Sequence, residues 1–125
     1  MLKGSIVALI TPFNNESLSE SDYVKLINYH LENGTNGIVP GGTTGESPTL
    51  SHNEHKKIIE IAVKECKRKI PVVAGTGSNS TDEAIELSKF AEKSVSDALL
   101  VVTPYYNKPT QEGLYQHYKK INDNV

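Results

Sequence analysis

The stretch Ile70-Pro-Val-Val-Ala-Gly-Thr-Gly-Ser-Asn-Ser-Thr-Asp-Glu83 joins a short apolar run to the start of a helix. Its first part, residues 70–74, has the length and β-branched content of a buried strand. Ser80 and Glu83 have the S-x-x-E spacing of a capping box, which is typical of helix N-termini. Apolar residues then recur at helical spacing, at Ala84, Leu87 and Ala91. The stretch therefore predicts a strand, a polar loop and an amphipathic helix.

The same strand-and-helix unit occurs four times along the chain. The other strands are expected at residues 5–10, 37–39 and 98–102, and the last of these is wholly apolar, as in a strand covered on both faces. Helices are expected after each strand: one with Tyr23 and Ile27 that ends at Asn33-Gly34, one from the S-x-x-E of Ser51 to about Arg68, the one after Ser80, and one with Leu114, Tyr118 and Ile121.

Alternating strands and helices with short links predict an α/β fold with parallel strands. The even unit length, near thirty residues, and the polar loop after each strand favour a barrel over an open sheet. A (β/α)₈ TIM barrel needs about 250 residues, so the 125 residues here fit its first four βα units. We therefore expect residues 1–125 to form the N-terminal, incomplete half of a barrel domain, whose open edges favour self-association.

Composition excludes several classes of function. A formal net charge of −2 gives no electrostatic footprint for nucleic acid or an anionic membrane. The apolar run at residues 6–10 is too short for a signal peptide or a membrane span, so a cytoplasmic location is expected. Cys66 is the only cysteine, and its place in an apolar helical pattern predicts a buried small side chain.

Two loops after predicted strands carry side chains with chemical uses. Residues 41–47 offer glycines and three hydroxyls, which suit either a small anion such as a carboxylate or an ordinary tight turn. The ending of a phosphate-binding P-loop is missing. Tyr105 and Tyr106 follow the fourth strand, and a tyrosine hydroxyl bonded to a threonine can relay protons. Packing of the loop by two aromatic rings is the commoner alternative.

Other polar residues favour structural roles. His52, Glu54 and His55 lack a further ligand with matching spacing, so capping or surface roles are favoured over a metal site. Asn79 and Glu83 are likewise interpreted as caps. No metal and no cofactor are expected. The lysines lie on helices, at helix ends or in polar segments, whereas an imine-forming lysine needs an apolar site. None of them is predicted to be a nucleophile.

At the level of motifs the chain resembles the dihydrodipicolinate synthase family along its whole length. The resemblance is carried by residues 4–12, by Gly42-Thr-Thr-Gly-Glu-Ser47, by Gly75-Thr-Gly-Ser-Asn79, by Thr103-Pro-Tyr-Tyr-Asn-Lys-Pro109 and by residues 111–118. The motif at residues 42–47 is shared with related pyruvate lyases such as N-acetylneuraminate lyase. The tyrosine segment is more specific to the synthases.

The resemblance implies a class I lyase that condenses pyruvate with L-aspartate 4-semialdehyde in lysine and diaminopimelate biosynthesis, and a homotetramer. It implies that Thr44 binds the pyruvate carboxylate, and that Thr43 and Tyr106 form a proton relay, with Tyr106 supplied across a dimer interface. A lysine-inhibitor site would match residues of three loops and two helix starts: Ser47, His52, His55, Asn79, Glu83 and Tyr105. Pro48 would lie on its rim.

Two departures from the family pattern leave alternatives open. The imine-forming lysine of the family has no counterpart up to Val125, so the chain alone is expected to be inactive. Val95 stands where the family usually has glycine, which costs about 1 kcal/mol if that position needs a positive φ. A truncated, non-catalytic remnant or interaction protein, and a related pyruvate lyase with another aldehyde partner, are the alternative hypotheses.

Overall fold

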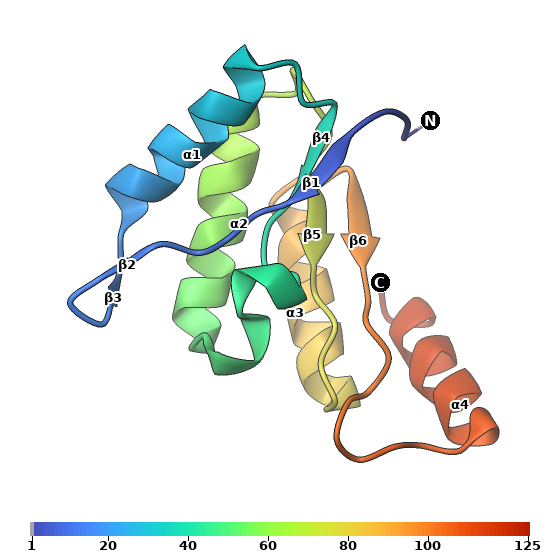
Figure 1. Ribbon diagram of the computed structural model, residues 1–125. Helices are drawn as coiled ribbons and strands as arrows, with labels where there is room; N and C mark the ends of the chain where they lie inside the picture. The colour runs from blue at the N-terminus through green and yellow to red at the C-terminus, as the bar shows by residue number, and fades with distance from the viewer. Residues whose placement is uncertain (1) are drawn as a thin grey trace.

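Four parallel strands alternate with four helices in the computed structural model, which describes residues 2–125 (Figure 1). The strands are β1 (Ile6–Ala8), β4 (Gly37–Val39), β5 (Val73–Gly75) and β6 (Ala98–Leu100). The helices are α1 (Glu20–Glu32), α2 (His52–Cys66), α3 (Thr81–Lys93) and α4 (Gln111–Asn122). This mixed α/β architecture confirms the predicted order of elements.

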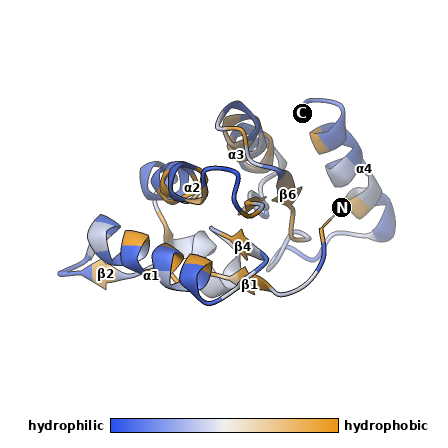
Figure 2. Cartoon of the chain, turned by 90° about the horizontal axis from the view of Figure 1, so that it is seen from above, coloured by the Kyte–Doolittle hydropathy of each residue, from blue (hydrophilic) through white to orange (hydrophobic). Residues whose placement is uncertain are grey.

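The strands lie beside one another in chain order. β1 pairs in parallel with β4, a parallel bridge joins Ile38 to Val72, and β5 pairs in parallel with β6. Successive helices pack against each other and follow an arc around the strands (Figure 2). Strand order and helix placement are those of consecutive βα units. The described residues form an open arrangement and do not close a barrel.

The strands are shorter than predicted, and local hydrogen bonding explains the third one. Pro71 has no N–H to give to a sheet, and the Val72 N–H donates to Asp97 Oδ2 at 2.8 Å instead of to a neighbouring strand. Regular pairing therefore begins only at Val73 and extends to Gly75. The predicted strands at residues 5–10 and 98–102 likewise shrink to β1 and β6.

The main core lies between the strands and the first two helices. Tyr23 and Ile27 of α1, Ile38 of β4 and Ile58 of α2 are fully buried together. A smaller cluster of Ile59, Ala74 and Ala91 joins α2, β5 and α3. Cys66 is buried as predicted, and burial raises the pKa of its thiol to about 11, which keeps it protonated and unreactive at neutral pH.

The inner face of the strands is open, contrary to the prediction for residues 98–102. Leu100 has 51 % of its surface exposed, and Ile10 and Val102 are also exposed. Helices cover only the outer side of the strands in residues 2–125 (Figure 2). The apolar composition of residues 98–102 predicted a strand covered on both faces. In residues 2–125 only the face toward the helices is covered.

A short antiparallel hairpin precedes α1 and was not predicted. It joins β2 (Phe13–Asn14) to β3 (Ser17–Leu18). Both turn residues, Asn15 and Glu16, have positive φ, which is the backbone of a type I′ turn. Asn15 was the available signal, because asparagine tolerates this conformation better than other non-glycine residues.

Helix ends agree with the sequence signals. Ser51 and Glu54 form a complete capping box at the start of α2, and Asn33 ends α1. Val95, just after α3, has a φ of 65°, so the left-handed conformation anticipated at this position is present. Within residues 2–125, the helices lack the combination of length and apolar character that crossing a bilayer requires.

Candidate active and ligand-binding site

The loop after β4 is held rigidly at the carboxyl end of the strands. It consists of two short 3₁₀ turns, Thr43–Gly45 and Ser47–Thr49, joined by Glu46 with a φ of 61°. The buried Thr11 hydroxyl, from the segment after β1, donates to the Gly45 carbonyl at 2.7 Å. Neighbouring βα units therefore fix the position of the hydroxyl-bearing turn.

Glycines allow the segments after β4, β5 and β6 to approach one another closely. A Cβ on Gly75 would lie 2.4 Å from the Gly41 carbonyl oxygen, and a Cβ on Gly77 would lie 2.3 Å from the Val102 nitrogen. Any larger residue would collide with backbone at either position. The backbones of three loops thus form one continuous wall at the carboxyl end of β4, β5 and β6.

Two adjacent cavities open at this wall. The smaller, of about 160 Å³, is lined by four glycines together with Thr43, Ser47, Leu100 and Val102. The larger, of about 230 Å³, lies toward the helices and is lined by polar residues that include Ser47, His52, His55, Glu83 and Tyr105. Ser47 and Gly77 contribute to both, so the two cavities share a wall.

Histidine 55 occupies the floor of the larger cavity rather than the protein surface. Its side chain is 3 % exposed, and its Nε2 atom lies 2.7 Å from the Gly75 carbonyl oxygen. Burial is the main cause that lowers the pKa of His55 below its usual 6.5. The neutral imidazole donating from Nε2 is therefore the form that fits. The predicted surface or capping role is wrong for this residue.

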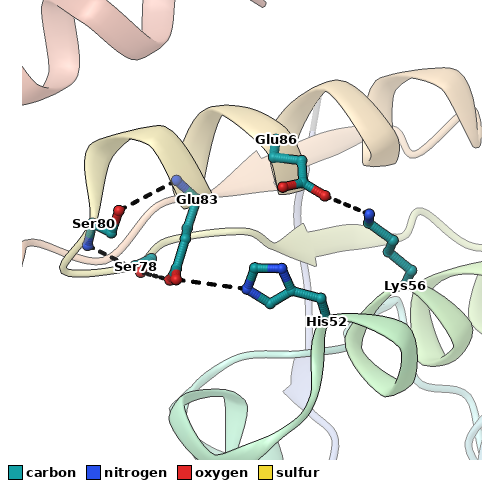
Figure 3. A network of polar contacts seen from close by, with 6 residues as sticks. All are labelled: His52, Lys56, Ser78, Ser80, Glu83 and Glu86. Carbon is teal, nitrogen blue, oxygen red and sulfur yellow. Dashed lines mark hydrogen bonds and ion pairs between the residues drawn. The ribbon is translucent and has the colours of Figure 1, made fainter.

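Glu83 and His52 both line this cavity, and their side chains point toward each other (Figure 3). Glu83 Oε1 lies 3.7 Å from His52 Nε2, and both side chains are about half exposed. Glu83 Oε2 accepts a hydrogen bond from the Ser78 hydroxyl at 2.8 Å. Its carboxylate is therefore directed into the site, whereas the sequence interpretation had assigned it to capping.

The tyrosine loop places its two rings differently. Tyr105 is half-buried and lines the larger cavity, while Tyr106 has a φ of 69° and is 92 % exposed. The Asn107 side chain donates to the Asn79 carbonyl at 3.1 Å and ties this loop to the one after β5. Tyr106 projects away from both cavities of its own chain.

The structure brings most, but not all, of the predicted site residues together around the two cavities. Thr43 reaches the smaller cavity, and four residues of the suggested inhibitor set besides Ser47 line the larger one: His52, His55, Glu83 and Tyr105. Thr44 is exposed on the same turn, and Asn79 is near the site through its backbone; neither lines a cavity. Three further residues that line the larger cavity, Gly77, Ser78 and Leu87, were not predicted as site residues, although the first two lie in the Gly75–Asn79 motif.

Comparison with known proteins agrees with this geometry. A family model described as the dihydrodipicolinate synthetase family matches residues 1–125. The chain belongs to this family. Relatives of the dihydrodipicolinate synthetase family include a 4-hydroxy-tetrahydrodipicolinate synthase of Pelagibacter ubique, 68% identical over 123 residues, which are 98% of this chain and 42% of that protein. The chain thus spans less than half the length of this curated relative.

Solved structures of the dihydrodipicolinate synthetase family have the same arrangement of elements. The chloride-inhibited synthase of Acinetobacter baumannii, complexed with pyruvate, matches with a TM-score of 0.96 and 52% identity over 100% of this chain and 43% of its own. The enzyme of Cyanidioschyzon merolae with lysine bound matches with a TM-score of 0.91 and 37% identity over 98% of this chain and 42% of its own.

Proposed function

We propose that these residues are the first four βα units, the N-terminal half, of a (β/α)₈ barrel enzyme that condenses pyruvate with L-aspartate 4-semialdehyde to 4-hydroxy-tetrahydrodipicolinate. The observation that carries the proposal is the glycine-walled cavity of about 160 Å³ beside Thr43, at the carboxyl ends of β4, β5 and β6. This is the end at which barrels of this class bind substrates, and a cavity of this size suits a small keto acid.

Thr44 is proposed to bind the pyruvate carboxylate, and Thr43 to take part in proton relay with a tyrosine. Both hydroxyls lie on a turn whose position the Thr11 bond to Gly45 fixes. Preorganised donors of this kind stabilise an anion without reorganisation. Tyr106 projects outward at 92 % exposure, which supports a role in the site of a second copy of the protein, within a homotetramer built from dimers.

The covalent step is proposed to use a lysine from the part of the relatives that this chain does not match. Imine formation needs a lysine held in an apolar site with a lowered pKa. Along residues 2–125 every lysine is exposed except Lys56 and Lys57, which are half-buried. Those two pair with Glu86 and Glu20. Both side chains are thus paired with carboxylates, whereas imine formation needs an apolar site.

The larger cavity is proposed to bind L-lysine as a feedback inhibitor. Its lining offers an acceptor for an ammonium group at Glu83, and polar side chains at Ser47, His52 and Tyr105 for the rest of an amino acid. Asn79 contributes through the loop that the Asn107 bond holds in place. The wall shared through Ser47 and Gly77 supplies a physical route from this cavity to the pyruvate site.

The test uses the full-length protein, meaning the whole encoded polypeptide that contains these residues. Treatment with pyruvate and borohydride should add one pyruvate-derived group to one lysine, and supply of aspartate semialdehyde should give the cyclic product. Thr44→Val should raise the KM for pyruvate about tenfold through loss of a bond to a charged group, whereas the neighbouring Thr49→Val should not. Turnover of a sugar acid in place of aspartate semialdehyde would contradict the proposal.

A further inference from the structure

Two helices of the chain begin with the same S-x-x-E motif, yet the two glutamates are used differently. At the start of α2 the motif forms a reciprocal capping box. Glu54 Oε2 accepts from the Ser51 backbone N–H at 2.8 Å, and Ser51 Oγ accepts from the Glu54 N–H at 3.3 Å. The carboxylate of Glu54 is thereby turned back toward its own helix end, which it closes through Oε2.

At the start of α3 only one of the two capping-box bonds is formed. Ser80 Oγ accepts from the Glu83 N–H at 3.5 Å, as in a capping box. The Ser80 N–H, however, donates to the hydroxyl of Ser78 at 3.1 Å and not to the Glu83 carboxylate. Ser78 is 4 % exposed, so its hydroxyl is fixed in place within the loop. It occupies the position that the glutamate would otherwise take.

The displaced carboxylate points toward His52 (Figure 3), and both residues line the larger cavity. The Ser78 hydroxyl donates to Glu83 Oε2 at 2.8 Å, while the other oxygen faces His52 Nε2 at 3.7 Å. Lys56, one turn further along α2, pairs with Glu86 at 2.5 Å and lies over the Phe90 ring. Lys56 is therefore engaged elsewhere, and the Glu83 carboxylate stays available to a ligand.

We propose that Ser78 is a positioning residue that releases Glu83 from helix capping and directs its carboxylate to an ammonium group of a bound amino acid. The inference rests on the proposed function of the larger cavity as an L-lysine site. One carboxylate cannot both close the capping box and face the cavity. By satisfying the Ser80 N–H, Ser78 removes the competing arrangement and shifts the population toward the ligand-binding one.

The sequence alone does not predict which of the two glutamates closes a capping box, because a residue with a hydroxyl group stands two positions before the capping serine in both motifs. Before α2 that hydroxyl belongs to Thr49, which lies in a 3₁₀ turn and donates to the Glu46 carbonyl at 3.0 Å. Before α3 it belongs to Ser78, which lies at the end of the loop that follows β5. The conformation of the preceding loop therefore decides which glutamate is released.

The experiment measures L-lysine binding to the full-length protein by calorimetry, with thermal unfolding in parallel. Ser78→Ala should weaken L-lysine about tenfold, the usual effect of losing a hydrogen bond to a charged group. The unfolding temperature should stay unchanged, because Glu83 closes the capping box in its place. A crystal structure of the variant should show the Glu83 carboxylate bonded to the Ser80 N–H.

Ser96→Ala is the matched control, because it also removes a serine hydroxyl, but from the segment that follows the C-terminal end of α3. The Ser96 hydroxyl is buried and has no hydrogen-bond partner in residues 2–125, so L-lysine binding should not change. Glu83→Ala and the double variant Ser78→Ala/Glu83→Ala complete a mutant cycle. Ser78→Ala should have no further effect once Glu83 is absent.

The outcomes separate the inference from the proposed function. If the unmodified protein does not bind L-lysine, or if Glu83→Ala binds it equally well, the proposed role of the cavity is wrong. If Glu83→Ala weakens binding but Ser78→Ala does not, the positioning role is wrong. The same holds if Ser78→Ala weakens binding equally with and without Glu83, because Ser78 would then act on the fold and not through the carboxylate.

Discussion

His55 Nε2 lies 2.7 Å from the carbonyl oxygen of Gly75, so a buried histidine of α2 is bonded to the last residue of β5. This contact spans 20 residues of sequence and joins two βα units directly below the larger cavity. It holds α2 against β5 at the point where the loop after β4 ends and the loop after β5 begins.

Replacing His55 should therefore destabilise the protein. His55→Leu keeps an apolar side chain in the space but leaves the Gly75 carbonyl without its partner, which costs about 1–3 kcal/mol. Urea unfolding of the full-length protein measures the loss. His52→Leu, at a half-exposed position on the same helix turn, should change the stability by less than about 0.5 kcal/mol. Equal losses in the two variants would contradict the importance of the buried bond.

The two buried histidines should make stability depend on pH. Burial lowers the pKa of His55 and of His117 below the usual 6.5, so the unfolded chain binds more protons in the interval between the folded and unfolded pKa values. The free energy of unfolding should then fall as the pH is lowered below about 6.5, and be constant above it.

Measurement of urea unfolding between about pH 7.5 and pH 5 tests the histidine effect. The double variant His55→Gln/His117→Gln, although less stable at every pH, should lose the slope in this range. If the double variant keeps the same dependence of the free energy of unfolding on pH, groups other than these two histidines cause it.

Substitution by alanine should destabilise the protein at Gly75 but not at Gly42. Gly75→Ala would place a Cβ 2.4 Å from the Gly41 carbonyl oxygen, and backbone cannot yield as a side chain can. A loss of about 1–3 kcal/mol or more is expected, with disruption of the wall between the loops. The nearest neighbour of a Cβ on Gly42 is a side-chain atom at 3.7 Å, so Gly42→Ala is the control and should fold normally. Circular dichroism and unfolding midpoints distinguish them.

Val95 stores backbone strain that a single substitution should release. Its φ of 65° is unfavourable for a β-branched residue, and 57 % of its surface is exposed, so little packing compensates. Val95→Gly should stabilise the protein by about 1 kcal/mol. Val95→Ala removes the branched methyl groups but keeps the Cβ, so it should give a smaller gain in stability. A destabilised glycine variant would show that the valine contributes contacts worth more than the strain.

The 125-residue chain alone should form no covalent adduct with pyruvate. The exposed or carboxylate-paired lysines of residues 2–125 have none of the apolar surroundings that imine chemistry needs. Mass spectrometry after borohydride reduction reads this out directly, with the full-length protein as the positive control. An adduct on any lysine of the short chain would show that exposure is a poor guide to reactivity here.

The sequence was sufficient to predict the repeated strand and helix units, their order and most helix starts. These features depend on residues within one or two turns of each other, such as the Ser51–Glu54 capping box and the apolar spacing of Tyr23 and Ile27. The motifs after the strands also placed the candidate residues at one end of the fold, where they line neighbouring cavities, because parallel strands end at one edge. The positive φ of Val95 was anticipated from the family resemblance, in which glycine usually stands at this position, and not from its local sequence.

Only the tertiary structure decided which of these polar residues face a cavity. The burial of His55 against Gly75, the outward projection of Tyr106 and the different use of Glu54 and Glu83 depend on how neighbouring βα units pack. Local sequence sets which hydrogen bonds a residue is able to make. The positions of groups 20 or more residues away, as in the His55 contact, determine which of those bonds are made, because a buried polar atom must bond to whatever partner the fold brings within reach.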